Sequence, residues 1–366
     1  MSILVINPGS TSTKLALFEN GQSVASQEIQ HRKSELAVFA RVTDQFDFRV
    51  QAARDFLENA GGDAVQLRAV AGRGGLLHPV KGGVYEVCDD MADDLRNARY
   101  GEHPCNLGGL IARAFGQKYG VPAYVVDPVV TDEMMDKARL TGMPAIRRRS
   151  LFHALNQRGM ARIVADKMGI EYEESNFIVC HMGGGISIGA HRRGKVVDVL
   201  NGLDGEGPFT PERTGGLPLI PVLHMVRDGE MSFEQMELAV LRRGGLFAHL
   251  GTNDPREIVA RIEAGDEAAH LVFKSFAYAV ARSVCSMVPA LVHGDSGPDL
   301  AAVILTGGLA RSKPLTAEIS RMVSHLGPVT VEPGEVEMDS LASGAERALE
   351  GEERVRSYVS DVAAWQ

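Results

Sequence analysis

Ser2-Ile3-Leu4-Val5-Ile6-Asn7-Pro8-Gly9-Ser10-Thr11-Ser12-Thr13-Lys14 is the stretch that decides the fold. Its apolar first half predicts a buried strand, and its second half is a small polar turn. Leu15 and Leu17 then continue as a second strand, and Asn20-Gly21 is a strong signal for a tight turn into a third. The chain therefore opens on strand, polar turn, strand, tight turn, strand.

The same order of elements recurs at residues 176–201. A strand is predicted from residue 176, His181-Met182-Gly183-Gly184-Gly185 forms a glycine-rich turn, and Arg193-Gly194 joins two further strands. Asn7 and His181 occupy corresponding positions, 181 − 7 = 174 residues apart. Because helices and more strands follow each copy, the sequence predicts two α/β domains of related topology, with both turns facing one cleft.

Composition narrows the class of protein. The chain has 366 residues, of which 45% are apolar and 23% charged, so a disordered or fibrous protein is excluded. The net charge is −9 and the longest basic run is Arg147-Arg148-Arg149, which we expect to be solvated, so nucleic acid is not an expected partner. The four cysteines lack zinc-site spacing, and we see neither a leader nor a membrane span. A soluble cytoplasmic enzyme is expected.

Two familiar motifs fit only in part. The segment from Gly189 to Val196 resembles a phosphate-binding P-loop, but Val196 replaces the hydroxyl that would hold Mg²⁺ and the segment is predicted as strand, turn, strand. Gly185-Ile186-Ser187-Ile188-Gly189 matches the nucleophile elbow of hydrolases, but no helix follows Ser187. We therefore expect neither a P-loop nor a serine nucleophile here.

The two polar turns suit anion binding. Backbone N–H groups in such turns, together with the hydroxyls of Ser10 and Ser12, can form a concave site, and Lys14 adds a positive charge beside it. Thr306-Gly307-Gly308 follows a predicted strand and precedes a helix, where backbone can approach a nucleotide.

Further polar residues stand in positions typical of a site. Arg73 and Arg213 lie in glycine-rich loops, where a guanidinium suits a phosphate or carboxylate. Asp127 ends a predicted strand, where carboxylates meet ligands in α/β folds. The candidate histidines are His103, His153 and His181, with His153 predicted inside a helix over residues 151–168.

Taken together, these motifs resemble those of the acetate/butyrate kinase family, which shares a superfamily with sugar kinases, heat-shock ATPases and actin. They run in the expected order from residue 3 to about 345. The sequence is more similar to butyrate kinases than to acetate kinases at three segments: Gly72-Arg73-Gly74-Gly75-Leu76-Leu77-His78-Pro79, Phe152-His153-Ala154-Leu155-Asn156-Gln157 and Pro211-Glu212-Arg213-Thr214-Gly215-Gly216-Leu217-Pro218.

The resemblance implies two duplicated domains of the ribonuclease-H-like, actin-like ATPase type around a central cleft. Residues 1–148 with about 340–366 would form an N-terminal lobe, and residues 149–339 a nucleotide-binding lobe. The lobes would close on their substrates about hinges near 147–150 and 335–345. A homo-oligomer, dimeric or larger, is also implied.

The implied reaction is reversible phosphoryl transfer between ATP and a short-chain carboxylate, giving ADP and an acyl phosphate, with Mg²⁺. Catalytic roles would fall to Arg73, Asp127, His153 and Arg213. The nucleotide and its phosphates would meet Asn7, Ser10, Ser12, Lys14, His181, Gly183, Gly184, Gly185, Gly307, Gly308 and Arg311. Gly75, His103 and Phe152 would line the acyl pocket. Asn7, Asp127 and Glu335 would lie near the metal, with Glu337 and Asp339 as alternatives to Glu335.

Alternatives remain open at this point. Acetate or propionate could be the preferred acid in place of butyrate. A serine hydrolase using Ser187 and a non-catalytic, actin-like nucleotide binder are the other two classes of function. Chain-length preference, direction of the reaction and oligomer size are not readable from the sequence.

Overall fold

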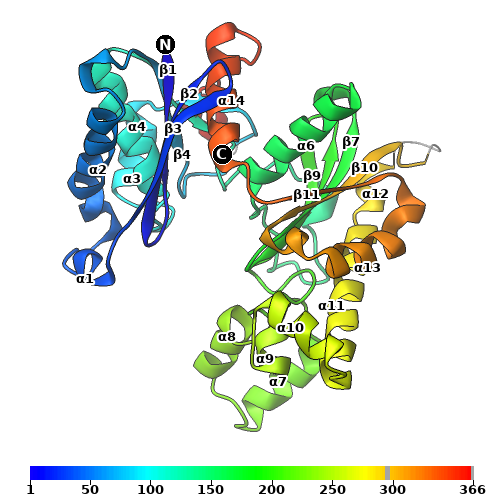
Figure 1. Cartoon of the computed structure of the whole chain (residues 1–366). Coiled ribbons are helices and arrows are strands. Elements are labelled where there is room, and N and C mark those ends of the chain that lie inside the picture. Colours follow the sequence, from blue (N-terminus) through cyan, green and yellow to red (C-terminus); the bar gives the residue numbers. More distant parts are fainter. Residues whose placement is uncertain (293–296, 364–366) are drawn as a thin grey trace. The chain divides into compact units, whose positions relative to one another are not determined.

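The computed structural model describes residues 1–292 and 297–363 (Figure 1). The chain divides into two compact units. Unit 1 consists of Met1–Asp132, Ala154–Gly159 and Val336–Gln366, and unit 2 of Glu133–His153 and Met160–Glu335. Helix α6 (Ala154–Met168) contributes residues to both.

Unit 1 is built on a six-stranded sheet in the order β3-β2-β1-β4-β6-β5. Strands β1, β4 and β6 are parallel to one another, and β2, β3 and β5 are antiparallel to their neighbours. Its elements are β1 (Ser2–Pro8), β2 (Ser12–Glu19), β3 (Gln22–Gln30), α1 (Lys33–Leu36), α2 (Phe46–Asn59), β4 (Leu67–Arg73), β5 (Val84–Glu86), α3 (Asp89–Arg96), α4 (Asn106–Tyr119), β6 (Ala123–Val126), α14 (Glu337–Glu350) and α15 (Tyr358–Ala363).

Alternation along the strands gives the unit 1 sheet two apolar faces. Leu4, Ile6 and Leu15 pack on one face with residues of α2, α3 and α4. Val5 and Ala16 pack on the other face with residues of α14. The two faces therefore carry different sets of side chains to the end of the sheet where β1 passes into β2.

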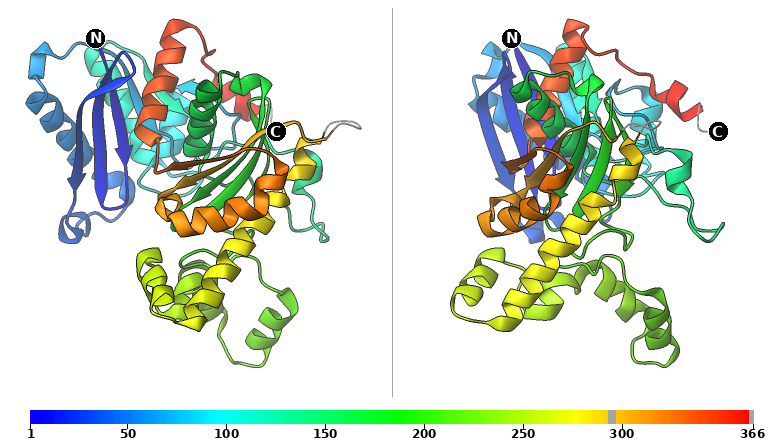
Figure 2. Two further views of the ribbon diagram at one scale, coloured as in Figure 1. Left: turned by 45° about the vertical axis from the view of Figure 1, so that its right-hand side comes forward. Right: turned by 90° about the vertical axis from the view of Figure 1, so that its right-hand side faces the viewer.

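Unit 2 is built on a five-stranded sheet in the order β11-β10-β7-β8-β9. Its apolar core joins that sheet to α11 and α13. The helices of residues 245–250 and 255–263 contact α11 and lie beside it in Figure 2. Its elements are α5 (Asp136–Arg139), β7 (Asn176–Met182), β8 (Ile186–Arg192), β9 (Lys195–Leu200), α7 (Leu219–Arg227), α8 (Phe233–Arg242), α9 (Gly245–Leu250), α10 (Pro255–Glu263), α11 (Glu267–Cys285), α12 (Val288–Leu291), β10 (Leu300–Gly307), α13 (Lys313–Val323) and β11 (Val329–Pro333).

The two sheets repeat one topology. Strands β3-β2-β1-β4-β6 of unit 1 correspond to β9-β8-β7-β10-β11 of unit 2, with antiparallel and parallel pairs in the same places. The first strands begin 176 − 2 = 174 residues apart, and the second strands 186 − 12 = 174 apart. The predicted α/β class with duplicated domains is confirmed.

Several predicted element boundaries are corrected. Helix α6 starts at Ala154, so His153 precedes the helix and does not lie within it. The helix predicted over residues 267–293 stops at Cys285, since Pro289 has no N–H to bond the carbonyl four residues back, and α12 follows; residue 293 lies outside the described residues. A helix predicted from residue 352 begins only at Tyr358, because the N–H of Arg356 bonds to Val84 of β5; residue 364 is likewise outside.

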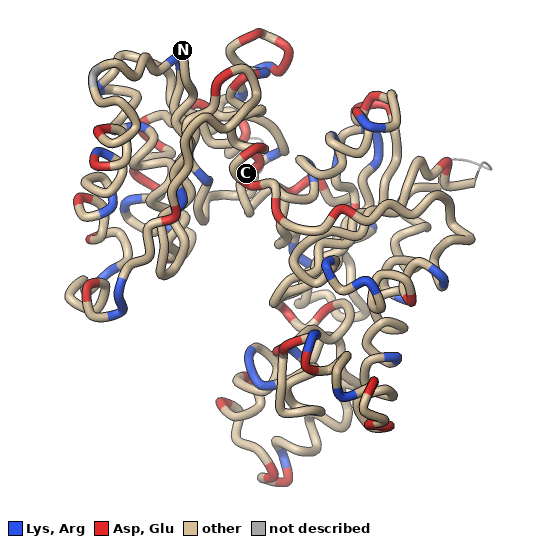
Figure 3. The backbone as a smooth tube through the Cα atoms, in the orientation of Figure 1, with Lys and Arg blue, Asp and Glu red and all other residues tan. Residues whose placement is uncertain are grey.

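Charged residues of both signs are interspersed along both units (Figure 3). The predicted solvation of the basic run is wrong for Arg148, whose side chain is 20% exposed and pairs with Asp198 and Glu206. Among the residues that the structure describes, Glu267–Leu291 is the one stretch long and apolar enough to cross a membrane by length and composition, and half of its most apolar window is buried.

Candidate active site

Unit 1 gathers three polar residues around the carboxylate of Glu337. Arg73, at the end of β4, approaches it with Nη2 at 3.0 Å from Oε1 and Nη1 at 3.1 Å from Oε2. Asn7, at the end of β1, donates from Nδ2 to Oε2 over 2.6 Å, and Asn156 of α6 donates to Oε1 over 3.1 Å. Arg73 also donates to the Asn7 amide oxygen over 3.3 Å. The guanidinium is thus fixed in one orientation while its side chain stays 28% exposed.

Strand register explains why these side chains meet. Asn7 lies directly opposite Lys14 in the antiparallel β1–β2 pair, so the two side chains share one face of the sheet. Ser12, two residues before Lys14, shares that face as well. It is the α14 face, on which Glu337 begins the helix.

The β1–β2 turn and the start of β2 carry the other unit 1 residues predicted for phosphate binding. The N–H of Gly9 donates to the Ser12 carbonyl over 2.8 Å, which closes the turn. Ser10 and Thr11 are exposed, and Ser12 and Lys14 are half-buried. Ser10, Ser12 and Lys14 therefore border the same end of the sheet as Asn7.

The three acidic residues that are candidates for binding the metal differ in their surroundings. Glu337 is buried among Asn7, Arg73 and Asn156, whereas Glu335 and Asp339 are exposed. Glu337 and Asn7 offer oxygen donors of the kind that Mg²⁺ uses, since this ion typically takes one or two protein carboxylates and completes its shell with water and phosphate. Among residues 1–292 and 297–363, no group of three or more His, Cys, Asp or Glu side chains is placed to hold a metal.

Asp127 stands in a separate environment of unit 1. Its backbone has a positive φ of 38°, and its carboxylate accepts from the N–H of Gly83 over 2.7 Å. Arg158 of α6 approaches it to 2.7 Å, with side-chain exposures of 5% and 3% for Arg158 and Asp127. In this structure Asp127 takes part in a buried ion pair, so its predicted catalytic and metal-binding roles stay predictions.

The residues predicted for the acyl pocket in unit 1 lie near Arg73. His103 Nδ1 is 2.8 Å from Cys105 Sγ. Burial, with a further contribution from Arg73, lowers the pKa of His103, and burial raises the pKa of Cys105 to about 11. A Cβ on Gly75 would lie 2.3 Å from Asn106 Oδ1 and 2.5 Å from Asn106 Cα, so Gly75 is required by close packing against α4. A side chain at position 75 would therefore point at Asn106 and not into open space.

In unit 2, His153 and His181 stack on each other. Their ring centroids are 4.2 Å apart with 28° between the planes. His153 Nδ1 is 2.8 Å from the hydroxyl of Ser187 on β8, and this contact orients the imidazole ring. Phe152, next to His153, is buried with 3% exposure.

Arg213 lies against the glycine-rich turn of unit 2. Nη1 donates to the Gly202 carbonyl over 2.8 Å, and a Cβ on Gly185 would come within 2.4 Å of the same nitrogen. Thr210 joins the two loops, since its hydroxyl donates to the Gly184 carbonyl and accepts from the N–H of Arg213. A side chain at position 185 would displace this guanidinium from its place.

The glycines after β10 form a second backbone-lined edge in unit 2. Gly307 has a φ of 89°, and a Cβ there would lie 2.4 Å from the Met182 carbonyl. Gly307 and Gly334 exchange two backbone hydrogen bonds of 3.0 Å. A Cβ on Gly308 would meet nothing within 4 Å, and Arg311 Nη2 would lie 3.2 Å from a Cβ on Gly334. Gly308 is therefore open to an approaching ligand.

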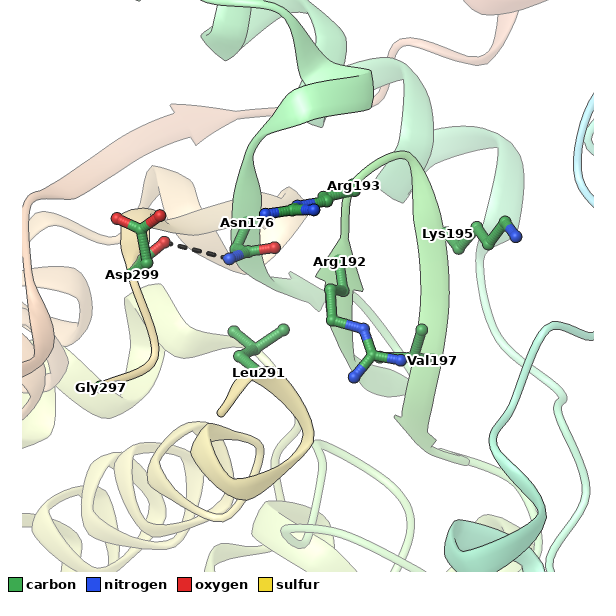
Figure 4. A pocket seen from close by; sticks show the side chains of 8 residues that line it. All are labelled: Asn176, Arg192, Arg193, Lys195, Val197, Leu291, Gly297 and Asp299. Carbon is green, nitrogen blue, oxygen red and sulfur yellow. Dashed lines mark hydrogen bonds between the residues drawn. The ribbon is translucent and has the colours of Figure 1, made fainter. Parts of the chain in front are cut away.

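The two rejected motifs behave as expected. The P-loop-like segment is the β8–β9 hairpin, with Arg193 and Gly194 at positive φ in its turn. Its basic residues line a cavity of about 440 Å³ at the opposite end of β7 from His181 (Figure 4). Ser187 lies within a strand and is 1% exposed, so it does not stand on a strand-to-helix elbow.

The repeated sheet order and the loops at the ends of the parallel strands define a two-domain α/β protein of the actin-like ATPase fold. Acetate kinase from Porphyromonas gingivalis has this fold, with a TM-score of 0.74, 19% identity and coverage of 95% of this chain and 99% of that chain. A propionate kinase from Francisella tularensis has a TM-score of 0.70, 19% identity and coverage of 94% and 98%.

The chain belongs to the acetokinase family, whose model matches residues 139–344. A probable butyrate kinase of Maridesulfovibrio salexigens is 49% identical over 98% of this chain and 99% of the relative. A probable butyrate kinase of Enterococcus faecalis is 47% identical over 98% and 97%. The resemblance drawn from the sequence motifs is confirmed.

Sequence reasoning missed some members of these groups. Glu337 was only an alternative to Glu335, and Asn156 and Ser187 had no predicted role in holding Glu337 and His153. A signal for Asn156 was present, because it stands three residues after His153 in the quoted segment.

Proposed function

We propose that this protein is a butyrate kinase, which transfers a phosphoryl group between ATP and butyrate or a related short-chain acid. The observation that carries the proposal is the 44–49% identity to probable butyrate kinases over nearly the whole chain. The local geometry of each unit supports it, because Glu337 and Asn7 hold the Arg73 guanidinium at the end of β4, and the Gly202 carbonyl holds the Arg213 guanidinium beside Gly185.

The chemistry needs positioning and charge stabilisation more than proton transfer. A carboxylate is already a nucleophile, so transfer to it can proceed directly and in line without a strong general base. Arg73 would bind the carboxylate and Arg213 the equatorial oxygens of the moving phosphoryl group. His153 would donate to that group, with Ser187 orienting its ring. Such preorganised donors lower the barrier because they need no reorientation during the reaction.

Other residues would bind the nucleotide and the acyl chain. Asn7, Ser10, Ser12 and Lys14 would contact the β- and γ-phosphates, His181 and the glycines 183–185 the remaining phosphates, and Gly307, Gly308 and Arg311 the nucleoside. Glu337 and Asn7 would hold Mg²⁺, which neutralises phosphate charge when bound. The acyl chain would lie near His103 and Phe152. We further propose a cytoplasmic homo-oligomer.

The hydrolase alternative has one observation in its favour, the 2.8 Å contact between His153 Nδ1 and Ser187 Oγ. A serine nucleophile must reach its substrate, however, and Ser187 is 1% exposed within β8. A fluorophosphonate probe that labels the native chain, with labelling lost in Ser187→Ala, would restore the hydrolase hypothesis.

A hydroxamate assay across C2–C6 acids with ATP and Mg²⁺ tests the proposal. Each additional buried CH₂ is worth about 0.8 kcal/mol, or roughly fourfold in kcat/KM, so butyrate should exceed acetate by roughly tenfold or more. A maximum at acetate or propionate would favour those kinases. Tight ADP binding without acyl phosphate at any chain length would indicate a non-catalytic nucleotide binder.

A further inference from the structure

Arg49 is a fully buried arginine in unit 1 whose hydrogen-bond partners are all neutral. It lies on α2 with 0% exposure. Its Nη1 donates to the Ser12 carbonyl over 2.8 Å and to the Thr13 hydroxyl over 3.0 Å. Its Nε and Nη2 donate to the amide oxygen of Gln45 over 3.1 and 2.9 Å. Within the described part of the chain, no carboxylate forms an ion pair with this guanidinium.

A buried charge of this kind is costly, because removing it from water is repaid only when an opposite charge or many hydrogen bonds surround it. Burial lowers the pKa of Arg49 to about 10, which leaves the side chain cationic at neutral pH. Its charge is felt nearby, since burial and then Arg49 lower the pKa of His31. Unit 1 therefore carries a positive charge whose counter-ion is not part of the sheet or its helices.

The strand register places this charge behind the β1–β2 turn. Thr13, which Arg49 contacts, points to the α2 face of the sheet, because its neighbours Ser12 and Lys14 point to the α14 face. Asn7 and Glu337 lie on that second face. Arg49 and the residues proposed to border the phosphates are thus separated only by the thickness of β2.

We propose that the buried guanidinium of Arg49 is a built-in counter-charge for the nucleotide phosphates, acting through the sheet from behind the β1–β2 turn. The inference rests on the proposed function, since it assigns a second cation to the phosphate site that Ser10, Ser12 and Lys14 border. Arg49 touches no substrate. It acts by its field, in protein interior where charges are screened less than in water, and by holding the Ser12 carbonyl.

The test is a charge series measured without metal. The dissociation constants of adenosine, AMP, ADP and ATP are determined by calorimetry in EDTA for the native chain and for Arg49→Met, which keeps a similar apolar length. A unit charge about 10 Å away at an effective dielectric constant of about 20 changes affinity roughly tenfold. We expect adenosine to bind within about twofold of native, and ATP to bind more than tenfold more weakly, with AMP and ADP between.

Gln45→Met is the matched control, because it removes the acceptor of two guanidinium hydrogen bonds and leaves the charge. It should keep the native dependence on phosphate number. If Arg49→Met does not fold, Arg49→Lys replaces it and should also keep that dependence, since the charge remains. Equal weakening of adenosine and ATP in Arg49→Met, unchanged affinities in that variant, or a dependence lost in Gln45→Met or Arg49→Lys would each overturn the proposal.

Failure of the proposed function would give a different result. A native chain that binds nucleotides with the expected dependence on charge, yet forms no acyl phosphate from any acid, would remove the kinase and keep the counter-charge. If the native chain forms acyl phosphate and Arg49→Met binds nucleotides with native affinities, the kinase function is kept and the counter-charge proposal is removed.

Discussion

Replacing Glu337 by glutamine should destabilise unit 1 and disable the group around Arg73. The carboxylate accepts from two Arg73 nitrogens, from Asn7 and from Asn156 at 2.6–3.1 Å. An amide keeps one oxygen and turns its NH₂ toward donors, so at least one charge-assisted hydrogen bond becomes a donor–donor contact. Removing one partner of a buried pair costs about 3–5 kcal/mol, but water replaces part of the interaction because Arg73 is 28% exposed. We expect a loss of about 2 kcal/mol.

Urea unfolding measures this loss, and hydrogen exchange of the α14 amides assigns it to unit 1. Glu335→Gln and Asp339→Asn are matched controls, since both acids are exposed and lie two residues away on either side. Each should change stability by less than about 0.5 kcal/mol. Glu337→Gln should also lower kcat by roughly 10²-fold, because Arg73 loses its fixed orientation, and raise the Mg²⁺ concentration at half-maximal rate. Normal stability and Mg²⁺ dependence in Glu337→Gln, with both lost in Glu335→Gln, would refute the reasoning and return the role to Glu335.

Three further predictions concern other parts of the chain. Arg213→Ala should lower kcat by roughly 10²-fold or more while ATP affinity changes less, which steady-state kinetics and calorimetry will separate; an unchanged kcat in the folded variant would remove Arg213 from the mechanism. His31 and His103 both have a pKa lowered by burial, so the unfolded chain binds protons before the folded one. The stability that comes from keeping these two histidines neutral is complete above pH 6.5 and is lost as the pH falls below it. The urea midpoint measured between pH 7.5 and pH 5 should therefore decline less steeply in His103→Asn than in the native chain. Gly75→Val should unfold or weaken unit 1 because its Cβ meets Asn106 backbone; a folded Gly75→Val enzyme with a shifted preference between acetate and butyrate would contradict the packing argument.

Much of the fold was predictable because it rests on short-range patterns. The strands of both copies follow from apolar runs that end in polar or glycine turns, and Asn20 and Gly21 both adopt the positive φ that the hairpin signal requires. The duplication followed from the 174-residue offset. The start of α6 was misplaced because the apolar periodicity extends past its true first residue, and local patterns do not reveal which backbone groups are bonded elsewhere.

The candidate site was predictable where a residue type and a glycine loop coincide, as at Arg73 and Arg213. Which of the three acidic residues between 335 and 339 joins the site was not predictable, because burial decides it. Glu337 is selected by the packing of α14 on a sheet whose strand β1 lies more than three hundred residues earlier in the chain. Arg49 was missed for a similar reason, since its importance comes from its complete burial behind the β1–β2 turn. The lobe boundaries and the site roles stay predictions.

The discontinuity of unit 1 has a consequence for the order of folding during synthesis. Strands β1 and β2 leave the ribosome before unit 2, but Leu341, Ala342 and Ala345 of α14, which cover one face of their sheet, follow unit 2 in the chain. At ordinary synthesis rates the interval is roughly 15–60 s. Unit 2 is complete in the chain before α14 emerges, so unit 1 begins before unit 2 and is completed after it. During the interval Val5, Ala16 and Phe18 lack their covering helix, and a chain ending before residue 336 would keep that apolar face uncovered.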